Sequence, residues 1–435
     1  MRTTPHILWI GLALLGSVSA APQIEQWHTE NSVRTLFVAA PELPMLDIAV
    51  TFDAGSGRDA SLAGLSQLTH SLLNTGTGAL NADAIAEKFE DVGAQFGVNV
   101  NLDRSSVALR SLTDETLFEQ ALSTYIAVLA QPAFPDKDYQ RLKNQALTAI
   151  RDEQQRPGSI ASKAFYKALY GDHPYGQPVS GDEHSIQAIT LEDVREFHRQ
   201  FLVAENAIIA IVGGIDSVKA RQIAERISSN LPRGSRPEPV GAPDHQLPAQ
   251  ELYIPYPSQQ AHVYLGQLGI ARGDPDYFTL YTGNHVLGGG GFTSRLVKEI
   301  RMERGLSYSV YSYFFPLRTS GPFILGLQTS TGQAQQAVEV SLRTVEGFIR
   351  DGPDEEELEL ARKSIIGGFP LRIDSNRDIL GYLSLIGYYR LPLDYLGTFN
   401  QHIAAVTRAD IREAFDRHLK SHRMVKIIVG GPEKE

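Results

Sequence analysis

Few residues in this sequence are arranged in a pattern that could bind a metal or act as a nucleophile. His418 and His422 lie four positions apart, which on a helix would place two imidazoles on one face, as zinc ligands require. No carboxylate lies between them, and histidines near a helix C-terminus more commonly meet solvent or the helix dipole. The chain has no cysteine and no G-x-S-x-G nucleophile motif. These residues do not indicate an independent hydrolase.

A glycine run at 288–291 precedes an arginine and a tyrosine that lie seven positions apart, Arg301 and Tyr308. The Gly-Lys-Ser/Thr ending of a phosphate-binding loop is absent, so we interpret the glycines as a flexible turn before a helix that begins near Ser294. A tyrosine hydroxyl can stabilise an oxyanion, and an arginine can hold a peptide carbonyl or carboxylate. From the residues alone, a surface ion pair and a core aromatic side chain are the more ordinary interpretation.

The elements that would position these residues mix strands and helices. Residues 62–75 predict a helix with leucines on one side, and Gly76 is its expected stop. Residues 96–103 alternate between apolar and polar side chains, which predicts a half-buried strand with an antiparallel partner at 105–112. We therefore expect an α+β fold made of α/β sandwiches, in which helices cover one face of a mixed or antiparallel sheet.

An internal repeat indicates a tandem duplication. The segment that begins Thr190-Leu-Glu-Asp recurs at Thr407, and a Val-Gly-Gly sequence follows each copy, at 212–214 and 429–431. Both pairs are offset by 217 residues, from 190 to 407 and from 212 to 429. Each threonine is expected to cap a helix that precedes a buried strand. The repeat predicts two homologous domains, 24–235 and 245–435, joined by a proline-rich linker at 236–244.

The helix at 62–75 resembles the first motif of the pitrilysin/insulinase-type peptidases, which carry the inverted zinc signature H-x-x-E-H. Position by position, the first histidine falls on Gln67, the glutamate on His70 and the second histidine on Ser71. The third ligand of the family, a downstream glutamate, falls on Thr148 or Ala149. A catalytic zinc needs three protein ligands, so the resemblance implies a degenerate site with no metal or other cofactor in this chain.

His70 and Glu153 could in principle rescue a metal site, but a lone histidine beside a serine is more often a polar helix-face residue.

The block 288–310 is similar to the second-domain motif of the same family, where an arginine and a tyrosine face the zinc across a closed chamber. The loop at 173–181 also matches, so the resemblance runs through nearly the whole chain. It implies substrate-binding and oxyanion-stabilising roles for Arg301 and Tyr308. In two-subunit members one chain carries the zinc and the other carries this pair. The resemblance therefore implies a non-catalytic subunit of a heterodimeric metallopeptidase, with a zinc-bearing partner of the same family and peptides or small unfolded proteins as substrates.

An alternative remains open at this point, because a duplicated sandwich could also serve as a peptide-binding or scaffold protein with no proteolytic role.

The net charge and the N-terminal residues limit the possible partners and the cellular location of the chain. A net charge of −10 argues against a nucleic-acid partner, because phosphate binding needs a basic surface. Residues 1–20 begin with Met1-Arg2, continue with an apolar run at 7–15 and end in small residues, which predicts a cleaved signal peptide and a periplasmic location. That run is too short to span a bilayer, and no other stretch approaches the required length, so we expect no membrane span after cleavage.

Overall fold

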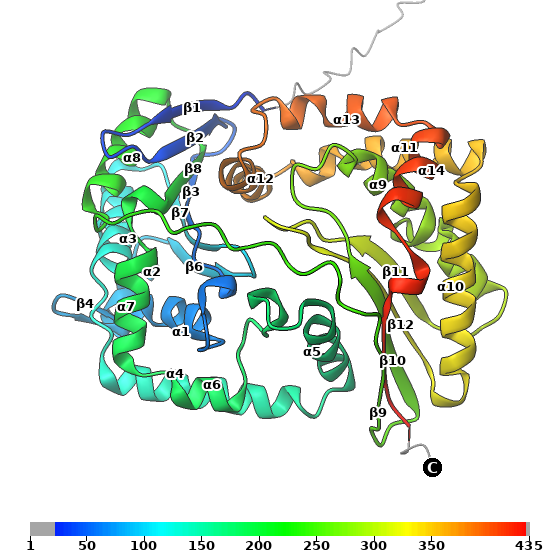
Figure 1. The fold of residues 1–435 in the computed structure, drawn as a ribbon. Coiled ribbons are helices and arrows are strands. Elements are labelled where there is room, and N and C mark those ends of the chain that lie inside the picture. Colours follow the sequence, from blue (N-terminus) through cyan, green and yellow to red (C-terminus); the bar gives the residue numbers. More distant parts are fainter. Residues whose placement is uncertain (1–21, 432–435) are drawn as a thin grey trace, which may run out of the picture.

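Two mixed β-sheets form the framework of the chain (Figure 1). The computed structural model describes residues 22–431, so the expected signal peptide at 1–20 lies outside the described residues. Sheet one has the strand order β1-β2-β8-β3-β7-β6. Its strands are β1 (Glu25–His28), β2 (Arg34–Ala39), β3 (Met45–Phe52), β6 (Gln95–Val100), β7 (Ser105–Leu112) and β8 (Ala207–Gly213). A short hairpin, β4 (Gly76–Thr77) with β5 (Leu80–Asn81), lies apart from it.

Sheet two repeats the topology of sheet one. Its order is β9-β13-β10-β12-β11, and its one parallel pair, β13 with β9, corresponds to the parallel pair β8 with β2. Its strands are β9 (Glu251–Ile254), β10 (Gln260–Leu268), β11 (Ser309–Phe314), β12 (Pro322–Ser330) and β13 (Val425–Val429). The duplicated helix starts are also confirmed, since Thr190 and Thr407 each cap a helix through a reciprocal capping box.

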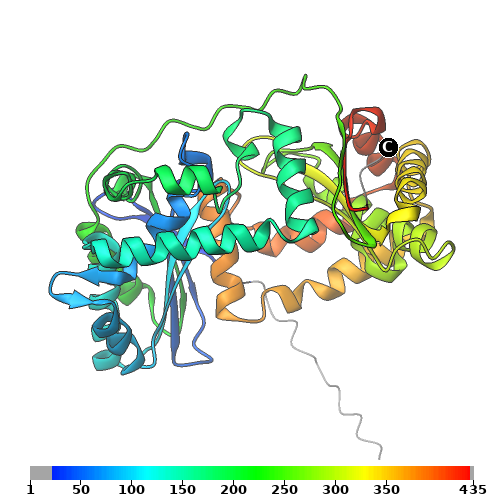
Figure 2. The same cartoon turned by 90° about the horizontal axis from the view of Figure 1, so that it is seen from below.

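Helices pack on both sheets, and the first half of the chain supplies eight of those described. They are α1 (Leu65–Leu72), α2 (Ala82–Glu90), α3 (Glu115–Ala130), α4 (Asp136–Glu153), α5 (Pro157–Tyr170), α6 (Glu183–Ala188), α7 (Leu191–Phe201) and α8 (Ser217–Asn230). The second half supplies α9 (Tyr277–Asn284), α10 (Ala334–Asp351), α11 (Glu355–Gly368), α12 (Asn376–Tyr389), α13 (Tyr395–Ala405) and α14 (Arg408–His418). The segment 231–250 between the halves contains no helix or strand, and it crosses from one half to the other as an extended connection (Figure 2).

The halves exchange helices across their boundary. Helix α12 of the second half packs against β2, β3 and β8 of sheet one, and α5 of the first half packs against β10 and β13 of sheet two. Each sheet is therefore covered by helices of its own half on one face and by a helix from the other half on the opposite face. The predicted sandwich, with helices on one face of a sheet, is confirmed within each half. The second face of each sheet is covered by a helix from the other half.

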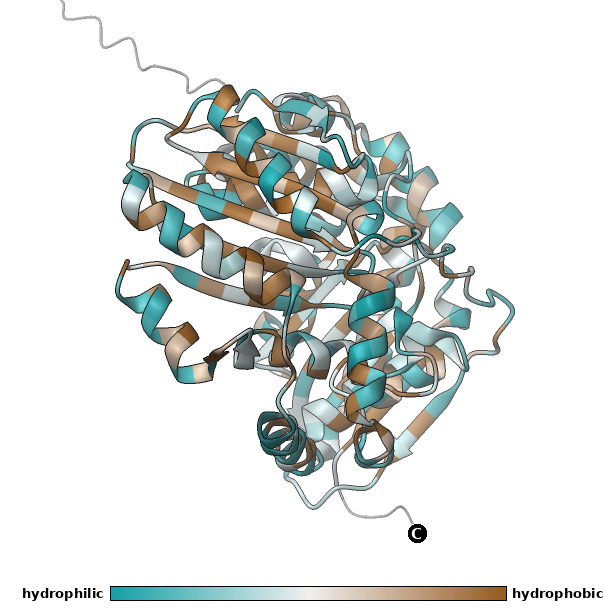
Figure 3. Cartoon of the chain, turned by 90° about the vertical axis from the view of Figure 1, so that its left-hand side faces the viewer, coloured by the Kyte–Doolittle hydropathy of each residue, from teal (hydrophilic) through white to brown (hydrophobic). Residues whose placement is uncertain are grey.

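Burial along the central strands follows from this double cover. In β3, Ile48 and Val50 face the core beneath the first half's own helices, whereas Ala49 between them joins the cluster that contains α12. Strand β8 is buried along its whole length for the same reason. Figure 3 shows helices striped in brown and teal, as expected of helices with one apolar face. Between residues 22 and 431, no helix is both long enough and apolar enough to cross a membrane.

Candidate functional site

Helix α1 presents the positions that match the two zinc-ligating histidines. Gln67 and Ser71 lie one turn apart on the same face, and Gln67 lines a cavity of about 510 Å³. The Ser71 hydroxyl is turned back on its own helix, where it donates to the Gln67 carbonyl oxygen at 2.9 Å. Zinc sites in proteins use imidazole, thiolate and carboxylate ligands, so an amide and an internally bonded hydroxyl do not fit the metal.

The start of α1 is nevertheless fixed as firmly as a working site would need. The buried carboxylate of Asp59 accepts hydrogen bonds from the backbone N–H groups of Gly64 at 2.8 Å and Ser66 at 2.9 Å. Gly64 has a φ of 93°, and a Cβ there would lie 2.6 Å from the Ile186 side chain. Asp59 and Gly64 therefore fix the first turn of α1, the helix that carries Gln67 and Ser71.

His70, at the position of the family's general base, is a core residue. Its side chain is fully buried, its Nδ1 lies 2.7 Å from the Ser66 carbonyl oxygen, and its ring meets Phe197 edge-on. Burial lowers the pKa of His70 to about 4, against the opposing effect of the Ser66 carbonyl, so the imidazole is neutral near pH 7. His70 does not line the cavity beside Gln67, and the polar helix-face position expected from the sequence is therefore wrong.

The positions matched to the third ligand lie on α4. Thr148 and Ala149 are both exposed, and the Thr148 hydroxyl donates to a carbonyl of its own helix at 3.0 Å. Glu153, at the end of α4, does line the cavity with Gln67. Its carboxylate is engaged by the Lys163 ammonium at 2.6 Å and accepts from the Ser180 hydroxyl at 3.3 Å. A lysine cation thus pairs with the carboxylate that comes closest to the degenerate site.

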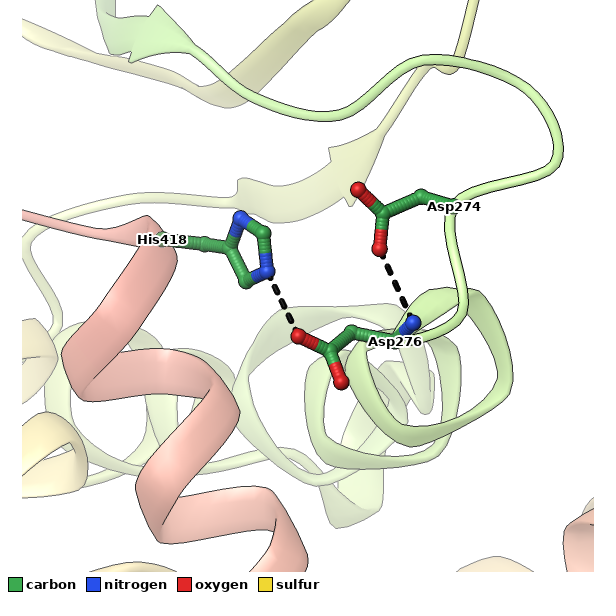
Figure 4. Close-up of side chains that lie close together, drawn as sticks. All are labelled: Asp274, Asp276 and His418. Carbon is green, nitrogen blue, oxygen red and sulfur yellow. Dashed lines mark hydrogen bonds and ion pairs between the residues drawn. The ribbon is translucent and has the colours of Figure 1, made fainter.

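Across residues 22–431, one other group has the composition of a metal site: Asp274, Asp276 and His418 (Figure 4). The Asp276 carboxylate already bonds His418 Nε2 at 2.7 Å and Arg417 at 2.6 Å, so the Arg417 guanidinium balances its charge. Helix α14 ends at His418, and His422 lies beyond it in a separate 3₁₀ turn. The four-residue spacing of these two histidines therefore does not place them on one helical face.

Arg301 and Tyr308 are in direct contact, as a functional pair would require. The Arg301 guanidinium lies 4.5 Å from the centre of the Tyr308 ring and 4.7 Å from that of Phe292, between the two rings. The Tyr308 side chain is 82% exposed and that of Phe292 is 68% exposed. Within the described part of the chain, Arg301 forms no ion pair, so neither the surface ion pair nor the core aromatic side chain considered from sequence is formed.

The turn between the two residues brings them together. The π-helical segment Val297–Met302 carries Arg301 and closes through hydrogen bonds from the N–H groups of Gly305 and Leu306. Gly305 has a φ of 61°, a left-handed conformation that glycine adopts without strain. The chain then reverses so that Tyr308 directly precedes β11, the edge strand of sheet two.

Comparison with known proteins places this geometry in a family. Residues 34–183 match the model for insulinase, peptidase family M16, and residues 188–365 match the model for the peptidase M16 inactive domain. The crystal structure of a peptidase M16 inactive domain from Pseudomonas fluorescens is 37% identical and superposes with a TM-score of 0.91, covering 94% of this chain and 98% of that one. The chain belongs to peptidase family M16.

Other M16 proteins resemble this chain over most of its length. A protein from Helicobacter pylori described as a non-peptidase homologue, YmxG, is 28% identical and aligns over 98% of each chain. A Bacillus subtilis protein described as an uncharacterised zinc protease is 25% identical over 81% of this chain and 85% of its own length. Within family M16 the present chain is an inactive homologue.

One polar cluster of this M16 chain was not found from sequence. The strand alternation placed Asp103 on the polar side of a half-buried strand, but its side chain is only 4% exposed. Its carboxylate accepts from the hydroxyl groups of Tyr175 and Tyr389 and from the backbone N–H of Arg318. Arg318 and Tyr389 belong to the other half of the chain. Residues so far apart in sequence leave no local pattern that could have revealed the contact.

Proposed function

We propose that this chain is the zinc-free subunit of a periplasmic two-subunit M16 peptidase. A zinc-bearing partner of the same family would activate the water, and this chain would supply Arg301 and Tyr308 to the shared chamber. The guanidinium would hold the peptide, and the tyrosine hydroxyl would donate to the oxyanion of the tetrahedral intermediate. The homologous domains 24–235 and 245–435 would form this chain's wall of the chamber, and the substrates would be peptides or small unfolded proteins.

The observation that carries the proposal is the contact of Arg301 with the exposed ring of Tyr308, without a zinc-ligating set beside them among residues 22–431. An arginine stacked between two exposed rings keeps its N–H donors free for a ligand. Arg295, by contrast, is paired with the Glu357 carboxylate at 2.6 Å. A scaffold would have no need for an unpaired arginine and an exposed tyrosine held in contact.

The test combines the purified chain with a zinc-bearing M16 subunit and measures cleavage of a quenched fluorescent peptide together with zinc content. Each chain alone should be inactive, and the mixture should cleave. Tyr308→Phe keeps the ring on Arg301 and removes only the hydroxyl. Loss of an oxyanion donor typically lowers kcat by roughly 10²–10³-fold, so a fall of about that size is expected at unchanged zinc content.

Arg304→Ala is the matched control for Arg301→Ala, because Arg304 lies three residues away and is paired with Glu299 at 2.7 Å. Arg301→Ala should lower turnover of the complex while Arg304→Ala leaves it near the wild-type rate. If no complex forms, or if both Arg301→Ala and Tyr308→Phe cleave as the wild type does, the chain is better described as a peptide-binding protein without a proteolytic role.

A further inference from the structure

A second concentration of arginines lies away from Arg301, in a cavity of about 590 Å³ bordered by α9, α12 and α13. Arg272, Arg372 and Arg377 all line it, and we call it the arginine cavity. Arg272 is half-buried, whereas Arg372 and Arg377 are exposed at its mouth. In a chain with a net charge of −10, three cations converging on one cavity need an explanation.

None of these arginines is paired with a carboxylate among residues 22–431. Arg272 donates to the Pro316 carbonyl oxygen at 3.3 Å, and its buried Nε has no acceptor. Arg372 donates to the Tyr281 hydroxyl at 2.6 Å, and Arg377 makes a long contact of 3.4 Å with the Gln95 side chain.

One acidic residue, Asp378, lines the cavity, and it is bonded to Ser375 at the start of α12. The cavity walls therefore carry an excess of two positive charges and an unused buried donor. Such a concave cationic surface focuses a positive potential that attracts anions.

The remaining walls are aromatic and apolar. The guanidinium of Arg272 lies 5.3 Å from the Tyr277 ring, and that of Arg372 lies 5.9 Å from the Tyr281 ring. Leu371, 74% exposed, stands at the mouth. An arginine fork matches a carboxylate with two parallel hydrogen bonds, and the rings fit the apolar body that carries it.

We propose that the arginine cavity binds a carboxylate group of a peptide, either its C-terminus or an acidic side chain. The identification of the ligand as a peptide rests on the proposed function, whereas the preference for a carboxylate rests on the cavity alone. Arg272 and Arg372 also line an adjoining cavity of about 570 Å³ that extends along β11, the strand that begins directly after Tyr308. A peptide held at Tyr308 could therefore reach the arginine cavity along that strand.

Binding is measured by fluorescence anisotropy with three labelled decapeptides of one apolar sequence. The first has a free C-terminal carboxylate, the second a C-terminal amide, and the third an amide together with one internal glutamate. Hydrogen bonds to charged groups are stronger than those between neutral groups, so at least one carboxylate peptide should bind about tenfold or more tightly than the neutral peptide. The tighter of the two identifies the source of the carboxylate.

The double variant Arg372→Gln/Arg377→Gln alters exposed side chains only, so the fold should be retained, and the carboxylate advantage should fall below about twofold. Arg272→Gln is the second variant, and Arg343→Gln, an exposed arginine near Glu339, is the control for loss of charge. Three results would overturn the inference. They are equal binding of all three peptides, an unchanged preference of the double variant for the carboxylate peptides, and an equal loss of that preference in Arg343→Gln. The binding measurement contains no zinc-bearing subunit, so it is independent of the peptidase assay. If the peptides bind equally but the two-subunit complex is active, only this inference is wrong. If the chain prefers carboxylate peptides but the complex is inactive, only the proposed function is wrong.

Discussion

His70 shows what became of the general-base position once the zinc ligands were absent. A glutamate that acts on a metal-bound water must face the cavity, whereas this imidazole is packed against Phe197 with its Nδ1 on a helix carbonyl. A buried neutral histidine also makes the stability of the protein depend on pH. The folded-state pKa of about 4 lies below the ordinary value near 6.5, so between these values the unfolded chain binds the proton and the folded chain does not.

The contribution of His70 to stability should therefore be fully present above about pH 6.5 and should be lost as the pH drops toward 4. From pH 7.5 to pH 4.5 the His70 contribution to this loss is about 2–3 kcal/mol. Urea unfolding of the wild type and of His70→Leu at both pH values measures it, with His198, another buried histidine, present in both proteins. The variant should lose less stability than the wild type over this interval, and an identical loss in both would show that His70 is not held neutral by burial.

Sequence was informative about which residues are missing from the metal site and uninformative about where their replacements point. The motif spacing assigns the two histidine positions to Gln67 and Ser71, because a helical signature can be compared one position at a time, and leaves the third ligand position at Thr148 or Ala149. It could not show that His70 faces the core, since α1 is buried on most of its circumference. The lack of an ion pair at Arg301 was equally hidden, because only the fold shows that no carboxylate of residues 22–431 reaches it.

At the scale of elements, the exchange of α5 and α12 is the feature that sequence did not disclose. The helix and strand types were predictable because their apolar periodicity is local, and the repeated order of five strands agrees with the duplication. The all-buried strand β8 indicates cover on both faces, but periodicity cannot say which helix provides it. Close approach of α12 to sheet one depends on Gly387, where a Cβ would lie 2.6 Å from Ile208 and 3.0 Å from Leu36.

Two glycines of α12 should consequently respond to alanine in opposite directions. Gly381 is exposed and a Cβ there meets nothing within 4 Å, so Gly381→Ala should stabilise by up to about 1 kcal/mol through helix propensity. Gly387→Ala gains the same propensity but overpacks the contact with sheet one at a cost of roughly 1–3 kcal/mol, so it should destabilise on balance. Urea midpoints of the two variants measure this contrast, and a rise for both would mean that α12 does not need the close approach.

For the molecule as a whole, the relative position of the halves depends on a buried carboxylate as well as on the exchanged helices. Asp103 of the first half accepts from the Tyr389 hydroxyl at 2.5 Å and from the Arg318 N–H at 2.8 Å, both in the second half. When a buried donor loses a charged acceptor, the free energy of unfolding falls by more than the hydrogen bond itself contributed. In the proposed complex this chain would form one wall of a chamber, and the hydrogen bonds of Asp103 between the halves would restrict the angle between the two sheets.

Asp103→Ala should therefore lower the free energy of unfolding by about 3–5 kcal/mol and broaden the distribution of distances between the halves. Asp47→Ala is the matched control, because Asp47 is equally buried and its partner Arg110, at 2.7 Å, lies in the same half. The chain has no cysteine, so spin labels at Ser229→Cys and Gln336→Cys report one defined distance by pulsed electron resonance. Both aspartate variants should lose stability, but only Asp103→Ala should widen the distribution. A narrow distribution in Asp103→Ala would assign the rigidity of the chamber wall to the exchanged helices alone.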